Sequence, residues 1–283
     1  MTPKLVVVIW LAITVFMAKE YVVLNKNPKQ RTMIGRVSCQ YFGHCQPMYP
    51  EAGKPLSFAL GVIGFSTICL TNFYIMRKHF MPMRTWGKLQ TWLNWHILFG
   101  LLGPTLIIFH TNFDVNGLVA ISFWSMMVSM TSGIVGRYLY VQLLQSKEGL
   151  RQRIDVYEQG FEKYLKLVPA HRKALDLAKS RSFLAAGGMS SNQMAATSLA
   201  PFLIRSFVGE MRIRVALPSL GFKAPPPLRA GLREWAILRK RLISLHYYKV
   251  IFGYWHSFHM PFAIFMYVVA IIHIISSLIF KVG

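Results

Sequence analysis

Residues 95–110 read WHILFGLLGPTLIIFH, and residues 259–273 read HMPFAIFMYVVAIIH. Both stretches are apolar apart from their histidines, and both lie inside longer apolar runs. A helix needs about 20 mostly apolar residues to cross the hydrocarbon core of a bilayer. The two stretches therefore predict membrane-spanning helices, and they decide the class of protein.

The composition of the whole chain agrees with this class. Of the 283 residues, 54% are hydrophobic and 15% are charged, against about 25% charged in a typical soluble domain. This apolar content excludes intrinsic disorder, and three cysteines are too few for a disulfide-rich secreted module. We therefore predict an all-α integral membrane bundle with a mostly helical cytoplasmic loop domain.

Five apolar runs are long enough to span a membrane. We expect these spans over residues 5–24, 56–76, 91–111, 117–144 and 250–280. They predict an N-terminal anchor (1–24), an extracytoplasmic loop (25–54), helices two to four (55–144), a basic cytoplasmic loop domain (145–249) and helix five (250–283). A cleaved signal peptide is the alternative for the first run, but the small residues of a cleavage site are missing around Ala18.

The net charge of +22 is concentrated in one segment, because residues 145–249 hold nineteen basic and seven acidic residues. Basic charge beside spanning helices is typical of a cytoplasmic loop facing anionic lipid, so we expect a membrane-lipid partner and no nucleic acid. The short 77–88 connection is also basic, whereas 110–116 carries only an acid. This favours an N-terminus inside and a C-terminus outside, in a bacterial cytoplasmic membrane. Basic residues within 25–54 oppose that orientation.

The basic loop and the outer loop contain further local signals. Residues 146–180 have the apolar spacing of an amphipathic helix, 185–198 are small and polar and suggest a flexible stretch, and 225–227 are three prolines that predict a break. In the outer loop, the spacing of Cys39 and Cys45 favours a short disulfide, with free thiols as the alternative. Cys69 falls within helix two as a packing residue.

Four histidines within the predicted spans carry the chemistry. His96 and His110 are 14 residues apart, and so are His259 and His273. At about 100° per residue, 14 steps place the second imidazole within about 40° of the first and ~21 Å further along the helix. Each helix therefore presents two imidazoles on one face, one near each membrane surface. A single such histidine is often only a hydrogen-bond partner of a neighbouring helix, but four at matched spacing favour a shared function.

The two helices are separated by one other helix and therefore run in the same direction. Matched in depth, His96 pairs with His259 on the inner side and His110 with His273 on the outer side. Two metal sites with trans imidazoles use all four, and a planar macrocycle fits between the helices. Gly100 and Gly103 would let a flat ring approach the backbone, although glycines also serve helix packing.

Two other residues lie close to the predicted inner site. Arg137 is the one formal charge well inside the fourth span, and we expect it to pair with a propionate of the inner macrocycle. Snorkelling to the lipid headgroups is the alternative. His256 competes with His259 as a ligand, but only His259 reproduces the 14-residue step to His273.

With these residues the chain resembles the membrane di-haem b-type cytochromes, which include cytochrome b of quinol-oxidising complexes and the ferric-reductase-like transmembrane proteins. The matching stretches are the two quoted above. The resemblance implies two bis-histidine haems b held by the four histidines. It also implies a quinone, and redox partners such as a multihaem c-type cytochrome or an iron–sulfur protein. No flavin or nicotinamide domain and no Pro-Glu-Trp-Tyr quinol-oxidation motif is present in the sequence.

The expected function is that of an electron-transfer subunit, which would carry electrons across the membrane between a quinone pool and a redox partner. Quinol oxidation or quinone reduction would be the associated reaction. The alternative is a haem-free transporter or channel that uses the same histidines for protons or metal ions. That alternative fits less well because proton and cation paths usually contain carboxylates, and none lies deep in spans two to five.

Overall fold

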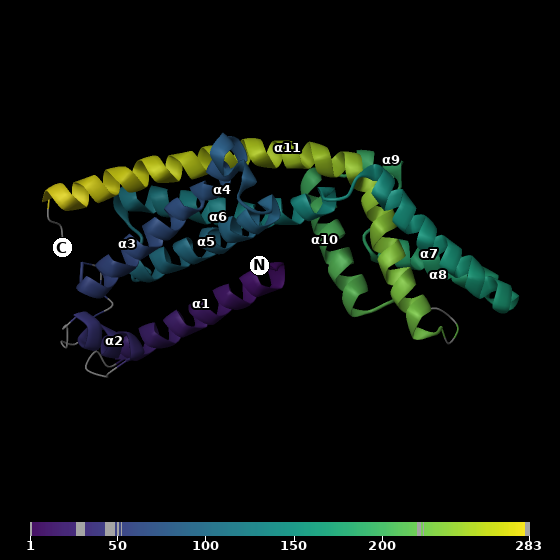
Figure 1. The fold of residues 1–283 in the computed structure, drawn as a ribbon, viewed down its shortest axis with the longest axis horizontal. Helices are drawn as coiled ribbons and strands as arrows, with labels where there is room; N and C mark the ends of the chain where they lie inside the picture. The colour runs from purple at the N-terminus through teal and green to yellow at the C-terminus, as the bar shows by residue number, and fades with distance from the viewer. Residues whose placement is uncertain are drawn as a thin grey trace. The chain divides into compact units, whose positions relative to one another are not determined.

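The structure is a computed structural model that describes residues 2–26, 32–42, 49, 51, 53–219, 222 and 224–280. The described chain is all-α (Figure 1), as predicted. Its α-helices are α1 (Pro3–Lys26), α2 (Met33–Phe42), α3 (Pro55–Leu70), α4 (Asn72–His79), α5 (Leu89–His110), α6 (Gly117–Leu143), α7 (Lys147–Leu167), α8 (Arg172–Ala185), α9 (Ser191–Ala196), α10 (Leu199–Val215) and α11 (Pro226–Phe280). Two short 3-10 turns, η1 (Met81–Thr85) and η2 (Pro169–His171), complete the set.

Five helical segments in the described part of the chain are long and apolar enough to cross a membrane, which confirms the predicted membrane class. They are α1, α3 together with α4, α5, the Val119–Leu143 part of α6, and α11. The last helix differs from the prediction, since it begins at Pro226 and not near Val250. Between Leu232 and Phe252 the sequence has neither glycine nor proline, so nothing ends the helix before the apolar run begins.

The chain forms two compact units, one within residues 1–135 and 257–283 and the other within residues 136–256. The chain passes from one unit to the other inside α6 and again inside α11. The predicted spans therefore lie largely in the first unit and the basic loop in the second.

In the first unit, α3 and α5 pack closely because small residues line their contact. A Cβ atom at Gly64 would lie 2.9 Å from Cδ1 of Ile107, and one at Gly103 would lie 2.5 Å from Cγ1 of Ile68. Small residues let the backbones of membrane helices approach each other. This contact holds the histidine-bearing helix α5 directly against α3.

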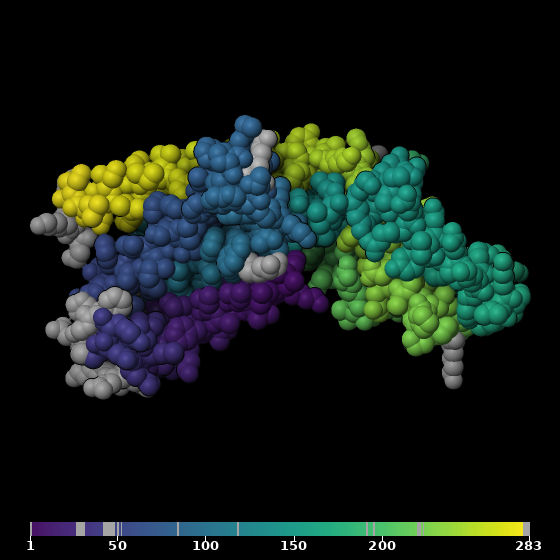
Figure 2. Space-filling view, in the orientation of Figure 1, coloured from purple at the N-terminus to yellow at the C-terminus, as the bar shows by residue number. Residues whose placement is uncertain are grey.

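Helix α1 packs against α5 as well, and polar contacts join the two (Figures 1 and 2). The indole N–H of Trp10 donates to the hydroxyl of Thr105 in α5 at 3.0 Å, and the Tyr21 hydroxyl donates to the side-chain oxygen of Asn112, in the turn that follows α5, at 2.5 Å. Buried Glu20 accepts hydrogen bonds from the first backbone N–H groups of α2, where a negative charge is favourable. Hydrogen bonds therefore hold α1 within the helix bundle of the first unit.

The second span is interrupted at Thr71, between α3 and α4. Tyr267 of α11 lies at this break, where its hydroxyl donates to the Ile68 carbonyl at 2.8 Å and accepts from the Asn72 amide at 2.9 Å. Polar backbone groups inside a membrane protein need such partners. These hydrogen bonds fix the position of α11 along the second span.

In the second unit, α7, α8, α10 and the first part of α11 form a hydrophobic core around Leu150, Leu175, Ile213, Leu232 and Ala236. The amphipathic stretch predicted over 146–180 is helical but broken at Pro169 into α7 and α8, since proline cannot continue a helix ladder. The flexible stretch predicted over 185–198 is wrong. It contains α9, which begins with a capping box between Ser190 and Gln193 and buries Met194.

The cysteines are only partly within the described residues. Cys39, in α2, is disulfide-bonded, whereas Cys69 is an exposed free thiol in α3. The predicted disulfide partner, Cys45, lies outside the described residues.

Candidate cofactor-binding site

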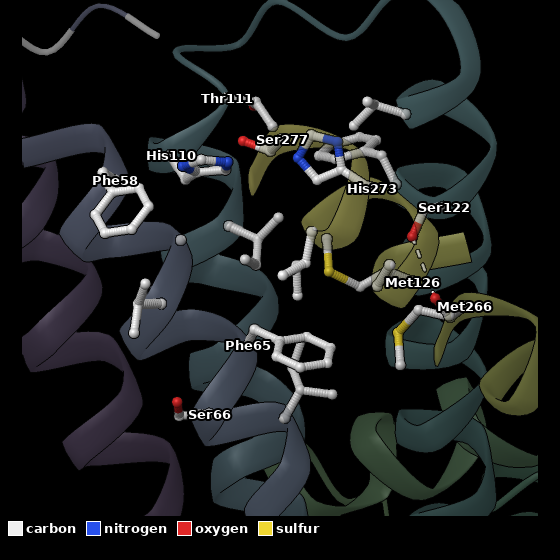
Figure 3. A pocket seen from close by; sticks show the side chains of 18 of the residues that line it. Phe58, Phe65, Ser66, His110, Thr111, Ser122, Met126, Met266, His273 and Ser277 are labelled. Atoms are coloured by element: carbon white, nitrogen blue, oxygen red, sulfur yellow. Dashed lines mark hydrogen bonds between the residues drawn. The ribbon is translucent and has the colours of Figure 1, made fainter. Parts of the chain in front are cut away.

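The first unit contains a cavity of about 420 Å³ between α3, α5, α6 and α11 (Figure 3). This volume is within the ~300–1,000 Å³ range of small-molecule and cofactor sites. Most of its lining is aromatic or aliphatic, and two histidines, His110 and His273, belong to it. The apolar lining includes Phe58, Val62, Phe65, Ile107, Phe123, Met126 and Met266.

His110, at the end of α5, is fixed by the first turn of α3. Its Nδ1 lies 2.7 Å from the Ser57 carbonyl oxygen, and the Ser57 hydroxyl donates to the His110 carbonyl at 2.8 Å. A carbonyl only accepts hydrogen bonds, so Nδ1 carries the proton and Nε2 is the basic nitrogen. This is the arrangement that orients metal-ligating histidines in proteins.

Gly61 leaves the space that the His110 ring occupies. A Cβ atom there would lie 2.8 Å from both Cε1 and Nδ1 of His110. Any side chain at position 61 would therefore displace the imidazole or separate α3 from α5.

His273 reaches the same cavity from α11. Figure 3 shows the imidazoles of His110 and His273 facing the cavity from opposite sides, with Ser277 near them. The structure thus brings together the pair that the 14-residue spacing matches on the predicted outer side. Ligation of a metal by this pair stays a prediction.

His259 and His96, the other predicted pair, are each held by a different neighbour. Nδ1 of His259 lies 2.7 Å from Oγ of Ser132, in α6. Nδ1 of His96 lies 3.0 Å from the Thr71 carbonyl oxygen at the break between α3 and α4, and the ring packs against Tyr74. Both contacts engage Nδ1, as for His110, but the pairing of these two histidines with each other stays a prediction.

The two glycines predicted beside the macrocycle have different surroundings. A Cβ atom at Gly100 would meet nothing within 4 Å, so this side of α5 has room for a flat group. Gly103 instead packs against Ile68 of α3, which is the helix-packing alternative. Only Gly100 therefore keeps open space around it.

Arg137 and His256 both belong to the second unit. Nη1 of Arg137 is buried without a hydrogen-bond partner, while the guanidinium carbon lies 5.9 Å from the Tyr140 ring centre. A buried guanidinium N–H without an acceptor suits an anionic group. His256 is exposed and packs edge-on to Trp255, so its surroundings differ from those of the four half-buried histidines.

Sequence reasoning missed Ser57, Gly61 and Ser132, which position the imidazoles. A signal for the first two exists, because Ser57, Gly61 and Gly64 are small residues at the four- and three-residue steps of one helix face. Ser132 has no such signal, since α6 contains several serines and only the fold shows which one meets His259.

Comparison with protein-family models, curated proteins and solved structures finds no match to this chain. In the described part of the chain, no cluster of three or more His, Cys, Asp or Glu side chains is arranged to hold a metal ion. Two imidazoles are too few for a bare ion, but they would be enough for a metal-bearing macrocycle that brings its other ligands with it.

Proposed function

We propose that this chain is a di-haem b-type cytochrome subunit that carries electrons across a membrane between a quinone pool and a redox partner. The observation that carries the proposal is the apolar cavity shared by His110 and His273. When bound there, a haem would supply one-electron redox chemistry. The residues of this chain supply its ligands, orientation and burial.

His110, from α5, and His273, from α11, would hold the haem. The Ser57 carbonyl holds the proton on Nδ1 of His110, so Nε2 would be the nitrogen that binds the iron. A haem held by two imidazoles would transfer electrons rather than bind oxygen. The apolar lining keeps water away and favours a low-polarity ligand.

His96 and His259 would hold the second haem. Both have an Nδ1 contact that sets the ring orientation, to a carbonyl in one case and to a hydroxyl in the other. Arg137, with its buried unpaired Nη1, would bind a haem propionate. Two haems at the depths of these pairs would form an electron path through the bilayer.

The proposed redox partners and the proposed membrane orientation rest on features outside the cavity, namely the sequence motifs and the distribution of basic residues. The chain has no flavin- or nicotinamide-binding motif, so electrons would come from or go to a quinone and a separate redox protein. A multihaem c-type cytochrome or an iron–sulfur subunit would serve as that protein. The basic segment 145–249 would face the cytoplasm of a bacterial inner membrane, with the N-terminus inside and the C-terminus outside.

The visible spectrum of the purified full-length chain tests the proposal. The expected result is two low-spin b haems per chain, from the reduced-minus-oxidised spectrum and from extracted haem. His110→Ala and His273→Ala should each cause loss of the same haem. His96→Ala and His259→Ala should each cause loss of the other haem. The exposed His256→Ala is the control and should retain both. A chain expressed with ample haem that contains none would contradict the proposal and favour a haem-free transporter.

A further inference from the structure

Helix α10 of the second unit exposes an apolar stripe on the side opposite to its buried face. At about 100° per residue, its buried residues Phe202, Ser206, Gly209, Glu210 and Ile213 share one side. The opposite side carries Ile204, Val208, Met211 and Val215, which are 64%, 53%, 53% and 82% exposed. Four exposed aliphatic side chains on one helix face are more than the scattered surface residues of a soluble domain.

Arginines flank this stripe on both sides. Arg205 and Arg212 lie about 100° and 80° from Ile204 in one direction, and Arg214 lies about 80° from it in the other. All three are exposed. Long basic side chains beside an apolar stripe can reach lipid headgroups while their stems cover the apolar surface.

The only acidic residue of α10 opposes this positive charge at one of the three arginines, Arg214. Glu210 is buried and its carboxylate is bound to Lys240 at 3.0 Å, Arg241 at 2.8 Å and Arg214 at 3.0 Å. It faces the interior of the second unit, and the cations around it outnumber it. The outer face of α10 is therefore apolar and cationic.

We propose that α10 is an interfacial helix that docks its Ile204–Val215 stripe onto the anionic lipid surface of the membrane that the chain spans. Charge complementarity selects the occupant, since phospholipid headgroups offer anions beside an apolar layer. The second unit is also covalently continuous with spanning segments at both of its ends, through α6 and α11. Docking therefore occurs at a high effective concentration of bilayer. The proposal is independent of haem binding.

The test uses the full chain in lipid nanodiscs, with a nitroxide label on Val208→Cys in a Cys69→Ser background. The matched control is Val156→Cys on α7, which replaces a valine of similar exposure, 66% against 53%. Collision with oxygen, which concentrates in lipid, is compared with collision with a water-soluble nickel chelate. In discs containing phosphatidylglycerol, the oxygen-to-nickel ratio should be several-fold higher at position 208 than at position 156.

Charge is tested by the double variant Arg205→Gln and Arg212→Gln. Each basic residue near an anionic surface is worth about fivefold in binding, so the ratio of docked to undocked helix should fall by about 25-fold. Discs of pure phosphatidylcholine, which carry no net charge, should also lower the ratio of docked to undocked helix. Equal oxygen-to-nickel ratios at positions 208 and 156 would overturn the proposal. A high oxygen-to-nickel ratio at position 208 that changes neither with lipid charge nor with the two arginine substitutions would also overturn it. Spin–spin broadening, which would show a second copy of the chain covering the stripe, would do the same.

Discussion

Nδ1 of His259 lies 2.7 Å from the hydroxyl oxygen of Ser132, and that hydroxyl donates to the Ser129 carbonyl at 2.9 Å. A serine hydroxyl has a single proton, and the Ser129 carbonyl can only accept. When the hydroxyl donates to this carbonyl, its oxygen accepts from Nδ1–H of the imidazole. Nε2 of His259 is then the basic nitrogen, as it is in His110, where a carbonyl performs the same task.

Ser132→Ala should weaken haem binding at the proposed site of His259. Without the acceptor, the Nδ1 proton is no longer held and the imidazole becomes a poorer donor to iron. Loss of such outer contacts typically costs about 10–100-fold in metal affinity, and the midpoint potential should rise because the ferric state loses more. Haem titration and a redox titration measure both effects. Thr131→Ala is the matched control, since Thr131 is exposed and its hydroxyl bonds only to backbone carbonyls of α6. An equal effect of both variants would contradict the role of Ser132.

Gly61→Ala should disturb the proposed haem site of His110 and His273 and spare the proposed site of His96 and His259. The added methyl would lie 2.8 Å from the His110 ring, which must rotate or move away. The expected result is loss of about one haem per chain, or a low-spin signal changed in one of two components, measured by electron paramagnetic resonance. Gly64→Ala is the control, because its methyl would press on the flexible end of Ile107 one turn away. If Gly64→Ala loses the same haem, the effect comes from separating α3 and α5 and not from the imidazole.

Arg137→Ala should lower the midpoint potential of one haem. In the proposed site the guanidinium charge would stabilise the electron-rich reduced state, and the buried Nη1, which has no hydrogen-bond partner in the protein, would donate to a propionate. A tenfold change in the relative stability of the two oxidation states corresponds to ~59 mV for one electron, so a shift of several tens of mV is expected. Arg137→Lys keeps the charge and should shift the potential less. If Arg137→Ala retains both haems at unchanged midpoint potentials, Arg137 does not bind a haem propionate.

The membrane class and the histidine-bearing helices could be predicted from the sequence because hydropathy and helical period are local properties. Within each helix the 14-residue step places both histidines on one face: His96 with His110, and His259 with His273. What surrounds them could not be predicted in this way. Ser57 and Ser132 meet the imidazoles from α3 and α6, and the choice of these partners depends on how the helices pack.

Two features of the helices have local physical causes. The span expected from about Val250 is the second part of a longer helix, because hydropathy changes there while helix propensity does not, so α11 begins at Pro226 and continues through the charged segment. The flexible stretch expected over 185–198 is wrong because composition suggested a loop, whereas Met194 is buried and the Ser190–Gln193 capping box starts a short helix.

Glu210→Gln should destabilise the second unit. Its carboxylate is the anionic partner of Lys240, whose side chain is 1% exposed, and it also accepts from Gln142 at 3.0 Å. Leaving a buried ammonium without its carboxylate typically costs about 3–5 kcal/mol. Hydrogen exchange across α10 and residues 226–256, measured on the full chain, should show faster opening. The control Glu148→Gln removes an exposed acid of α7 and should change nothing. Adding Lys240→Met to Glu210→Gln should restore part of the protection, because the unpaired charge is gone.

The stability of the second unit should also depend on pH through Glu210. Burial raises the pKa of this carboxyl, but Lys240 and Arg241 lower it more, so that it falls from an ordinary value of 4.5 to about 2. Because the folded-state pKa lies below the unfolded value, the stabilisation is complete above about pH 4.5 and disappears as the pH falls toward 2. A difference of this size corresponds to about 3 kcal/mol at neutral pH. Hydrogen exchange, corrected for its intrinsic pH dependence, should show α10 losing protection over this interval, and Glu210→Gln should remove that part of the pH dependence. A variant that keeps the same acid transition would assign it to another carboxyl.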